Sequence, residues 1–155
     1  MKIRRATIND MGKINNLLCQ VLEIHHEGRP DIFKGNAKKY TDDELRNIIT
    51  DDEKPIFVAE SDEDVVGYAF CIFQQYKNNN ILTDIKTLYI DDLCVDETKR
   101  GMHIGRNLYE YVLDFAKKSG CYNVTLNVWE CNKKAKGFYE NLGMEVQKTY
   151  MEKVL

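Results

Sequence analysis

The chain has 155 residues, of which 43% are hydrophobic and 30% charged, and its formal net charge is −3. That length fits one domain, residues 1–155, and the mild acidity argues against a dedicated nucleic-acid binder, which usually carries a strongly basic face. No apolar run approaches the roughly 20 residues of a membrane span and the N-terminus has no apolar signal region, so we expect a soluble, cytoplasmic protein with no membrane partner.

The first half of the chain begins with one strand and two helices. Residues 3–6 form the strand, and Thr7 with Asp10 three residues later resembles a capping box that opens a helix running to about His25. A loop broken by Gly and Pro follows, and Thr41 caps a second, short helix.

The remaining elements are mostly strands, with two further helices. They are, in chain order, strands at 55–60 and 65–76 around a hairpin turn, an extended stretch at 81–95, a helix from Ile104 that stops at Ser119–Gly120, a strand at 124–129, a helix at 132–142 closed by Gly143, and a last strand from Met144 onward. A strand meander followed by β-α-β-α-β indicates the α/β or α+β class, with a mixed, mostly antiparallel sheet and helices on both faces.

The cysteines are odd in number and widely spaced, with no CxxC pair: Cys19, Cys71, Cys94, Cys121 and Cys131. Neither a disulfide framework nor a zinc cluster is indicated, and the three histidines add no ligand spacing. We expect free thiols in a reducing cytoplasm and no metal site.

A glycine-containing turn stands between the extended stretch and the following helix. Arg100, Gly101 and Gly105 open that helix, and free N–H groups at a helix start bind anions such as a pyrophosphate. Lys99 and Arg106 add positive charge at the same place. An ordinary strand–helix turn with solvated basic residues explains this spacing equally well, whereas the Walker and dinucleotide-binding motifs are absent.

Two motifs resemble one enzyme family. The run VDETKRGMHIGRNLYEY, residues 95–111, resembles the acetyl-CoA-binding motif of the GNAT N-acetyltransferases, whose signature is Arg or Gln, two residues, Gly, one residue, and Gly or Ala. The run LNVWECNKKAKGFYENLGM, residues 126–144, is similar to the family's Asn-x-x-Ala-x-x-Phe-Tyr-x-x-x-Gly-Phe block. The order of elements fits over nearly the whole chain. The resemblance implies the GNAT fold, with acetyl-CoA as co-substrate.

The resemblance also implies which residues bind acetyl-CoA: Leu93, Cys94, Val95, Arg100, Gly101, Met102, His103, Ile104, Gly105, Arg106 and Asn132. Backbone groups of 93–95 would pair with the pantetheine arm, and Asn132 would cap the last helix as well as contact the cofactor. Lys133, Lys134 and Lys136 either meet the 3′-phosphate or form a solvated basic face. His103 departs from the family's usual Gly, so we expect weaker or shifted binding, with the loop N–H still supplied if φ is negative.

For catalysis, Tyr139 matches the family tyrosine that protonates the departing thiolate, although its helical spacing also suits a core aromatic. The base is Asp91 by resemblance to polyamine acetyltransferases, then Asp92, then Glu130, or else a water chain. Strand alternation places the two aspartates on opposite faces, so at most one should point at the acceptor. Both could also be solvated strand-edge charges.

The expected function is acetyl transfer from acetyl-CoA to a primary amine of a small molecule or protein, with a small cationic amine favoured. Transfer would be direct, in a ternary complex, without an acetyl-Cys94 intermediate. The loop at 25–34 would wall the acceptor site. The alternative is a non-catalytic acyl-CoA-binding or sensing module. We expect a homodimer that pairs through Met144–Leu155.

Overall fold

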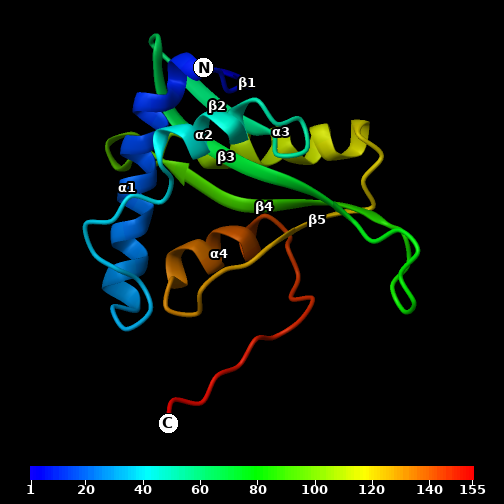
Figure 1. Ribbon diagram of the computed structural model, residues 1–155. Coiled ribbons are helices and arrows are strands. Elements are labelled where there is room, and N and C mark those ends of the chain that lie inside the picture. The colour runs from blue at the N-terminus through cyan, green and yellow to red at the C-terminus, as the bar shows by residue number, and fades with distance from the viewer.

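Five strands form a single sheet in the computed structural model, which describes residues 1–155 (Figure 1). They are β1 (Lys2–Arg5), β2 (Ile56–Ser61), β3 (Asp64–Gln75), β4 (Lys86–Val95) and β5 (Asn123–Leu126). The strands lie in sequence order, with antiparallel pairing from β1 to β4 and parallel pairing of β4 with β5. The predicted mixed, mostly antiparallel sheet is therefore confirmed.

Four α-helices cover the two faces of this sheet. They are α1 (Met11–Gly28), α2 (Asp42–Ile49), α3 (Ile104–Lys118) and α4 (Lys133–Asn141), with short 3-10 turns η1 (Ile8–Asp10) and η2 (Glu97–Lys99). The helix starts follow the predicted caps: Thr41 accepts a hydrogen bond from the Glu44 N–H at 3.2 Å, and Asn132 accepts one from the Ala135 N–H at 3.1 Å. No helix combines the length and apolar character that crossing a membrane requires.

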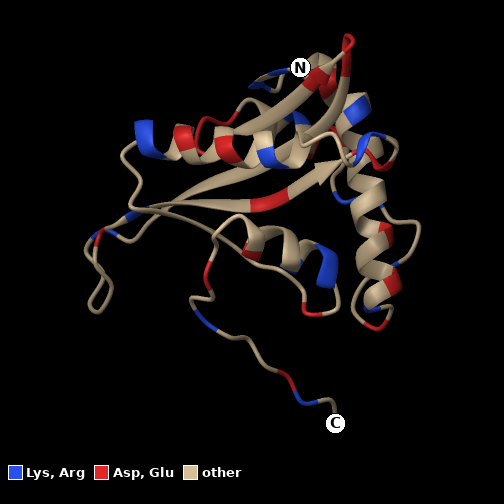
Figure 2. Cartoon of the chain, turned by 180° about the vertical axis from the view of Figure 1, so that it is seen from behind, with Lys and Arg blue, Asp and Glu red and all other residues tan.

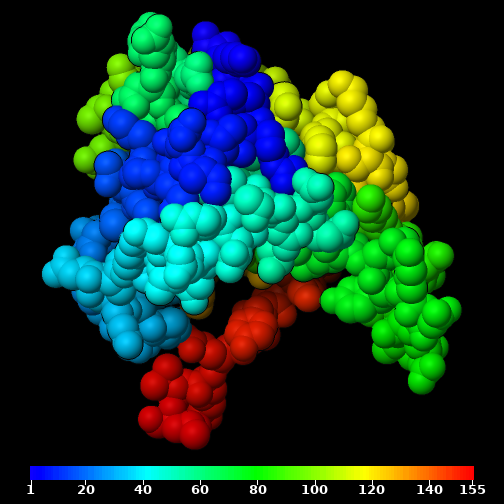
Figure 3. Space-filling view, turned by 45° about the horizontal axis from the view of Figure 1, so that its top comes forward, coloured from blue at the N-terminus to red at the C-terminus, as the bar shows by residue number.

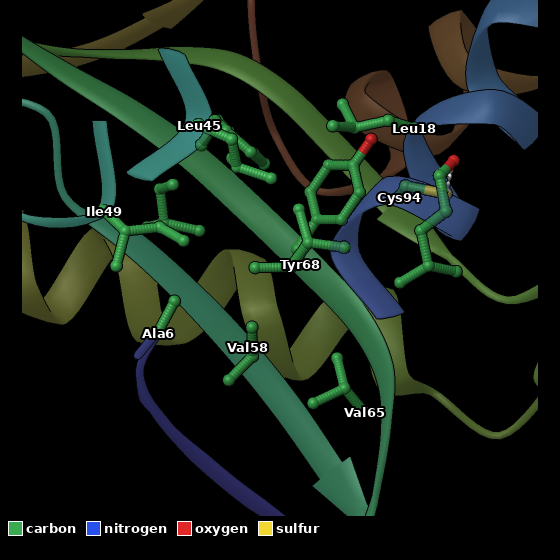
Figure 4. Packing of buried hydrophobic residues seen from close by; sticks show 12 residues of the cluster. Ala6, Leu18, Leu45, Ile49, Val58, Val65, Tyr68 and Cys94 are labelled. Carbon is green, nitrogen blue, oxygen red and sulfur yellow. Dashed lines mark hydrogen bonds between the residues drawn. The ribbon is translucent and has the colours of Figure 1, made fainter. Parts of the chain in front are cut away.

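Each face of the sheet has its own core. On one face, α1 and α2 pack over β2 and β3, and Figure 4 shows Tyr68 lying among residues such as Leu45, Val58 and Cys94. On the other face, α3 contributes Leu108 and Val112, which are fully buried. Residues of α4 pack only at the margin of this second core. The helix α4 thus lies beside the edge of the sheet that β4 and β5 form (Figure 1).

The expected last strand is wrong. Residues from Met144 onward form no strand, and they extend away from the body of the molecule (Figures 1 and 3). Val146 is 74% exposed and Tyr150 98%, because no neighbouring strand reaches them. Two other expected strands are shorter than predicted: the stretch at 81–95 pairs only from Lys86, and β5 ends at Leu126.

Candidate active site

The site is built where two parallel strands part. The pairing of β4 with β5 stops at Ile90 and Leu126, whereas β4 continues to Val95. On its other side, β4 stays paired with β3 up to Val95. Backbone groups of residues 91–95 that point away from β3 therefore have no strand partner, which leaves an edge able to pair with an extended ligand.

A bulge in β4 lies at this same point. Phe70 of β3 pairs with Asp92, and the next residue, Cys71, pairs with Ile90, so Asp91 is the extra residue. A bulge breaks the alternation of side chains along a strand. The expectation that Asp91 and Asp92 face opposite sides is consequently wrong, because both carboxylates contact one ammonium group. Figure 2 shows this acidic stretch of β4 in red.

The shared ammonium belongs to Lys39, in the loop between α1 and α2. Its Nζ lies 3.2 Å from Asp91 Oδ2 and 3.8 Å from Asp92 Oδ2. Tyr68 donates a 2.8 Å hydrogen bond to Asp92, and the Tyr40 hydroxyl lies 3.5 Å from Asp91 Oδ2. Two carboxylates thus share one cation and two phenol groups at the place where β4 loses β5.

Burial sets the electrostatics of this pair. It raises the pKa of Asp92, and the nearby Lys39 charge and Tyr68 hydroxyl offset only part of that effect. Burial lowers the pKa of Lys39, but the attraction of Asp92 and Asp91 outweighs it, so the Lys39 pKa is raised. The ammonium group of Lys39 therefore faces two carboxylates, and one of them, Asp92, releases its proton less readily than an exposed aspartate.

Tyr139 of α4 lies at the margin of the second core, where its ring is 6.3 Å from that of Tyr109. Burial raises the pKa of its phenol, and nearby Asp92 raises it further. The hydroxyl takes part in no hydrogen bond within the chain. The sequence-based alternative, a core aromatic, and the proposed acid role are both compatible with this half-buried position, and the proton stays on the phenol at neutral pH.

The expected cofactor loop opens α3. Gly101 has φ +85°, and no group of the chain accepts the N–H groups of Ile104, Gly105 and Arg106. A Cβ on Gly105 would lie 3.3 Å from the Phe138 ring and 3.5 Å from Val95, so the start of α3 fits closely between β4 and α4. The N–H groups and the helix dipole favour an anion here.

His103 is exposed and has φ +59°, in the left-handed region that glycine prefers. The condition of a negative φ, on which the expected supply of the His103 N–H depended, is therefore not met: the backbone has the shape that a glycine would have, and the imidazole is added to it. Its side chain caps nothing in α3. The N–H groups at the start of α3 consequently receive no acceptor from the His103 side chain.

The charged residues beside Asn132 form their own pairs. Glu130 binds both Lys133 and Lys136, with a 3.0 Å contact to Lys136, and its side chain is 72% exposed. Hydrogen bonds from Lys133 and Lys136 lower the pKa of Glu130. Glu130 is thus engaged at the surface and is not directed at the two aspartates, whereas Lys134 has no ion-pair partner.

Cys94 points into the core that α1 and α2 cover, where its thiol lies 3.7 Å from the Leu17 carbonyl oxygen. Burial raises the pKa of Cys94 to about 12. A thiol of that pKa is almost wholly protonated at neutral pH and is a poor nucleophile. Its place in the sheet supports a role for its backbone only.

The end of α1 and the loop after it pack against the segment that follows β5. The Phe33 ring stacks on His25 at 5.0 Å and meets the Trp129 ring edge-on at 5.0 Å. Burial lowers the pKa of His25, which nearby Asp92 partly counteracts. Residues from His25 near the end of α1 to Phe33 in the following loop therefore lie against Trp129, after β5. That this segment forms a wall of the acceptor site stays a prediction.

These features agree with the comparisons to known proteins. The model of the "Acetyltransferase (GNAT) family" matches residues 20–144. The chain belongs to the GNAT acetyltransferase family. This GNAT protein is 31% identical over 149 residues to the peptidyl-lysine N-acetyltransferase YjaB of Salmonella typhimurium, a match that covers 94% of this chain and 84% of that protein. It is therefore an acyltransferase of the N-acetyltransferase type.

Two further likenesses support the GNAT fold. The chain is 37% identical over 68 residues to the glucosamine 6-phosphate N-acetyltransferase of Arabidopsis thaliana, a match that spans 44% of either protein. A crystal structure of a mutant of the BH1408 protein from Bacillus halodurans has a TM-score of 0.95 at 34% identity, with 100% of this chain and 99% of that chain covered.

Sequence reasoning missed the GNAT chain's basic and phenolic partners of the acidic pair: Lys39, Tyr40 and Tyr68. Lys39 is 52 residues from Asp91, and nothing in its local pattern points to a strand so far along the chain. Tyr68 has the period of a core residue and is fully buried, but its hydroxyl has a polar partner. The hydroxyl of a buried tyrosine usually needs a hydrogen-bond partner, and this requirement is the one feature of the sequence that could have pointed to a polar contact of Tyr68.

Proposed function

We propose that the protein transfers the acetyl group of acetyl-CoA to a primary amine, with a small cationic amine as the favoured acceptor. The observation that carries this proposal is the acidic pair Asp91 and Asp92, which holds an ammonium group at the point where β4 loses its neighbour. A cationic acceptor has the same charge and hydrogen-bonding capacity as Lys39. The relative named as a peptidyl-lysine N-acetyltransferase is consistent with an amine at the end of a lysine-like stem.

The residues present fit acetyl-CoA as co-substrate. The open edge of β4 at Leu93–Val95 suits the pantetheine arm, whose amides can pair with it like a strand. The N–H groups at 102–106 suit the pyrophosphate, with Arg100 and Arg106 as nearby positive charges. Asn132 and the unpaired Lys134 lie at the start of α4, where they could contact the same molecule. Bound acetyl-CoA supplies the activated acetyl thioester.

The chain's own residues then manage the protons. An alkyl ammonium has a pKa near 10 and must lose a proton before it can attack. We assign its acceptance to Asp91 or Asp92, because both carboxylates contact an ammonium group, that of Lys39. Tyr139 keeps its own proton, because burial raises its pKa, and can donate a hydrogen bond to a departing thiolate. A phenol with a raised pKa is a weak acid, so we expect stabilisation by that hydrogen bond to accompany or precede proton transfer.

Tyr139→Phe tests this mechanism. We expect kcat to fall by about 100-fold or more while the KM for acetyl-CoA changes little, since the lost hydroxyl acts on the leaving group. Tyr122→Phe is the matched control, because Tyr122 is 76% exposed and lies outside the site. The measurement is thiol release from acetyl-CoA with a panel of polyamines, amino acids, aminoglycosides and lysine peptides. If Tyr139→Phe stayed within a few-fold of wild type, the acid role would be wrong.

The alternative is a non-catalytic acyl-CoA-binding or sensing module of the same fold. One residue favours it, His103, which places an imidazole in the cofactor loop where the resemblance implies glycine. Binding of acetyl-CoA without thiol release across the whole amine panel would support that alternative and contradict the enzyme proposal.

We also infer a homodimer in the cytoplasm. The C-terminal residues carry apolar side chains that nothing covers, including Val146, Tyr150 and Met151, and a second copy of the chain would shield them. All five cysteines are free thiols, as in a reducing compartment. Light scattering at micromolar concentration measures the assembly, and a monomer mass there would contradict the dimer.

A further inference from the structure

Lys39 differs from the other lysines in what its ammonium contacts. Its Nζ lies within 4 Å of both Asp91 and Asp92. The other lysines that form ion pairs do so with carboxylates outside the site: Lys13, Lys38, Lys54, Lys118, Lys133 and Lys136. The loop between α1 and α2 therefore brings a primary amine of the chain itself to the place where the acceptor amine is expected.

This placement is held by packing next to Lys39. The Tyr40 ring stacks on Phe70 of β3, with ring centres 6.0 Å apart and planes 19° apart. Only 34% of the Lys39 side chain and 11% of the Asp92 side chain are exposed. An ion pair made by a fully exposed lysine contributes little to stability, because the long side chain loses conformational freedom and water screens the charges. The Lys39 side chain is thus held beside Asp91 and Asp92.

We propose that Lys39 is an internal acceptor: with acetyl-CoA bound and no external amine in the site, the protein acetylates its own Lys39 side chain. This inference rests on the proposed function and adds a modification site to it. In the reaction, a bond forms between Lys39 Nζ and the acetyl carbon, and the bond from that carbon to the CoA sulfur breaks with its electron pair on sulfur. One ammonium proton passes through Asp91 or Asp92 to solvent, and a second ends on the thiol by way of Tyr139.

The surroundings of Lys39 fix how fast this reaction can be. The groups that face its ammonium are Asp91 and Asp92 on β4, Tyr40 beside it and His25 on α1. The two carboxylates hold most of the lysine in its charged form, so only a small neutral fraction can attack. We expect a slow, single modification per chain whose rate rises about tenfold per pH unit between pH 7 and 9.

The product also changes the site. Acetylation removes the positive charge of Lys39, which leaves Asp91 and Asp92 without a resident cation. An external ammonium then meets two uncompensated carboxylates. An external amine added beforehand competes for the same place, so 1,4-diaminobutane should slow the modification of Lys39.

The test is incubation of the purified protein with acetyl-CoA and no amine, followed by intact-mass measurement and peptide fragmentation. We expect one acetyl group at Lys39, added at least about tenfold faster than at Lys38. Lys38 is the matched control, since it is the neighbouring residue and pairs with Asp42 at 2.6 Å, away from the site. Lys39→Arg should abolish the modification, Lys38→Arg should leave it unchanged, and folded Tyr139→Phe should slow it about tenfold or more.

Three results would overturn the inference: equal rates at Lys39 and Lys38, a Lys39 rate that Tyr139→Phe leaves unchanged, or a rate that scales with protein concentration. The first two indicate uncatalysed chemistry, and the third indicates transfer between molecules. Thiol release with the amine panel separates the two proposals. Turnover of an external amine with unmodified Lys39 overturns only the internal acceptor, whereas absence of both reactions overturns the proposed function as well.

Discussion

Two charge clusters in this molecule have the same composition, one cation with two carboxylates, but different construction. At the start of the chain, Arg4 of β1 binds Asp10 through two hydrogen bonds of 2.8 and 2.9 Å and binds Glu60 through another of 2.8 Å. In the candidate active site, Lys39 makes one contact of 3.2 Å and one of 3.8 Å. The planar guanidinium of Arg4 can form two parallel hydrogen bonds to one carboxylate, whereas the ammonium of Lys39 makes longer and weaker contacts with its two carboxylates.

The difference also shows in how readily the carboxylates ionise. Hydrogen bonds from Arg4 hold the pKa of Asp10 below its ordinary value, whereas burial raises the pKa of Asp92. The first cluster is satisfied by strand and helix residues and leaves nothing for a ligand. In the second cluster the carboxylates lie on β4 but the cation comes from a loop, and the Lys39 charge offsets only part of the effect of burial on Asp92. We infer that the first cluster stabilises the fold and that the second is suited to exchange its cation for a substrate amine.

The largest expected effect is on the first cluster. Asp10→Asn should lower the free energy of unfolding by about 3 kcal/mol, because it leaves the Arg4 guanidinium partly buried without its main partner. Urea unfolding at pH 7 measures this change. The kinetic constants of the folded variant should stay near those of wild type, since Asp10 lies outside the site. A loss below about 1 kcal/mol would remove the distinction between the clusters.

The same variant should respond differently to acid. The native-state pKa of Asp10 is lowered, so its contribution to stability is present above the ordinary carboxyl pKa and is lost as pH falls through the lowered one. The amide introduced by Asp10→Asn does not titrate, and the unfolding free energy of the variant should therefore depend less on pH in that range.

A smaller effect is expected at the second cluster. Lys39→Met keeps a stem of similar size and should cost less than about 1 kcal/mol of stability, because its ion pair is looser and one third exposed. The Lys39 charge lowers the pKa of Asp92, so removing it raises that pKa further. Since the base must be deprotonated, the acid limb of the kcat/KM profile should move to higher pH.

The groups that face Asp92 are Tyr68 on β3, Asp91 on β4 and His25 on α1, and all three remain in this variant. Lys38→Met is the control, because Lys38 pairs with Asp42 and should leave the profile in place. A shift of the acid limb to lower pH, or a stability loss equal to that of the Asp10 variant, would contradict the assignment of the two clusters.

The two clusters also differ in how far the sequence predicts them. The capping pair of Thr7 and Asp10 is local, three residues apart, and it was predicted and confirmed. The acidic pair was recognised, but the faces of Asp91 and Asp92 were not, because the bulge depends on pairing with β3. Local signals likewise placed the helix caps and the glycine turns correctly.

Contacts between distant segments could not be predicted in the same way. Lys39 reaches Asp91 only because α1 and α2 pack on the face where β4 bulges, and no local pattern encodes that approach. Residues from Met144 onward read as a strand because they alternate loosely, but a strand needs a neighbour, and β5 ends before it could supply one.

The smallest expected effect on stability concerns an exposed ion pair, that of Lys13 and Asp64. Lys13 and Asp64 form an ion pair with the same 2.8 Å separation as Arg4 and Asp10, but their side chains are 54% and 49% exposed. Water screens such a pair, so Asp64→Asn should change the free energy of unfolding by less than about 0.5 kcal/mol. Urea unfolding in low and high salt measures it beside the Asp10 variant. If both variants lost the same stability, separation alone would set the strength of these pairs, and burial and hydrogen-bond geometry would no longer distinguish a structural cluster from an exchangeable one.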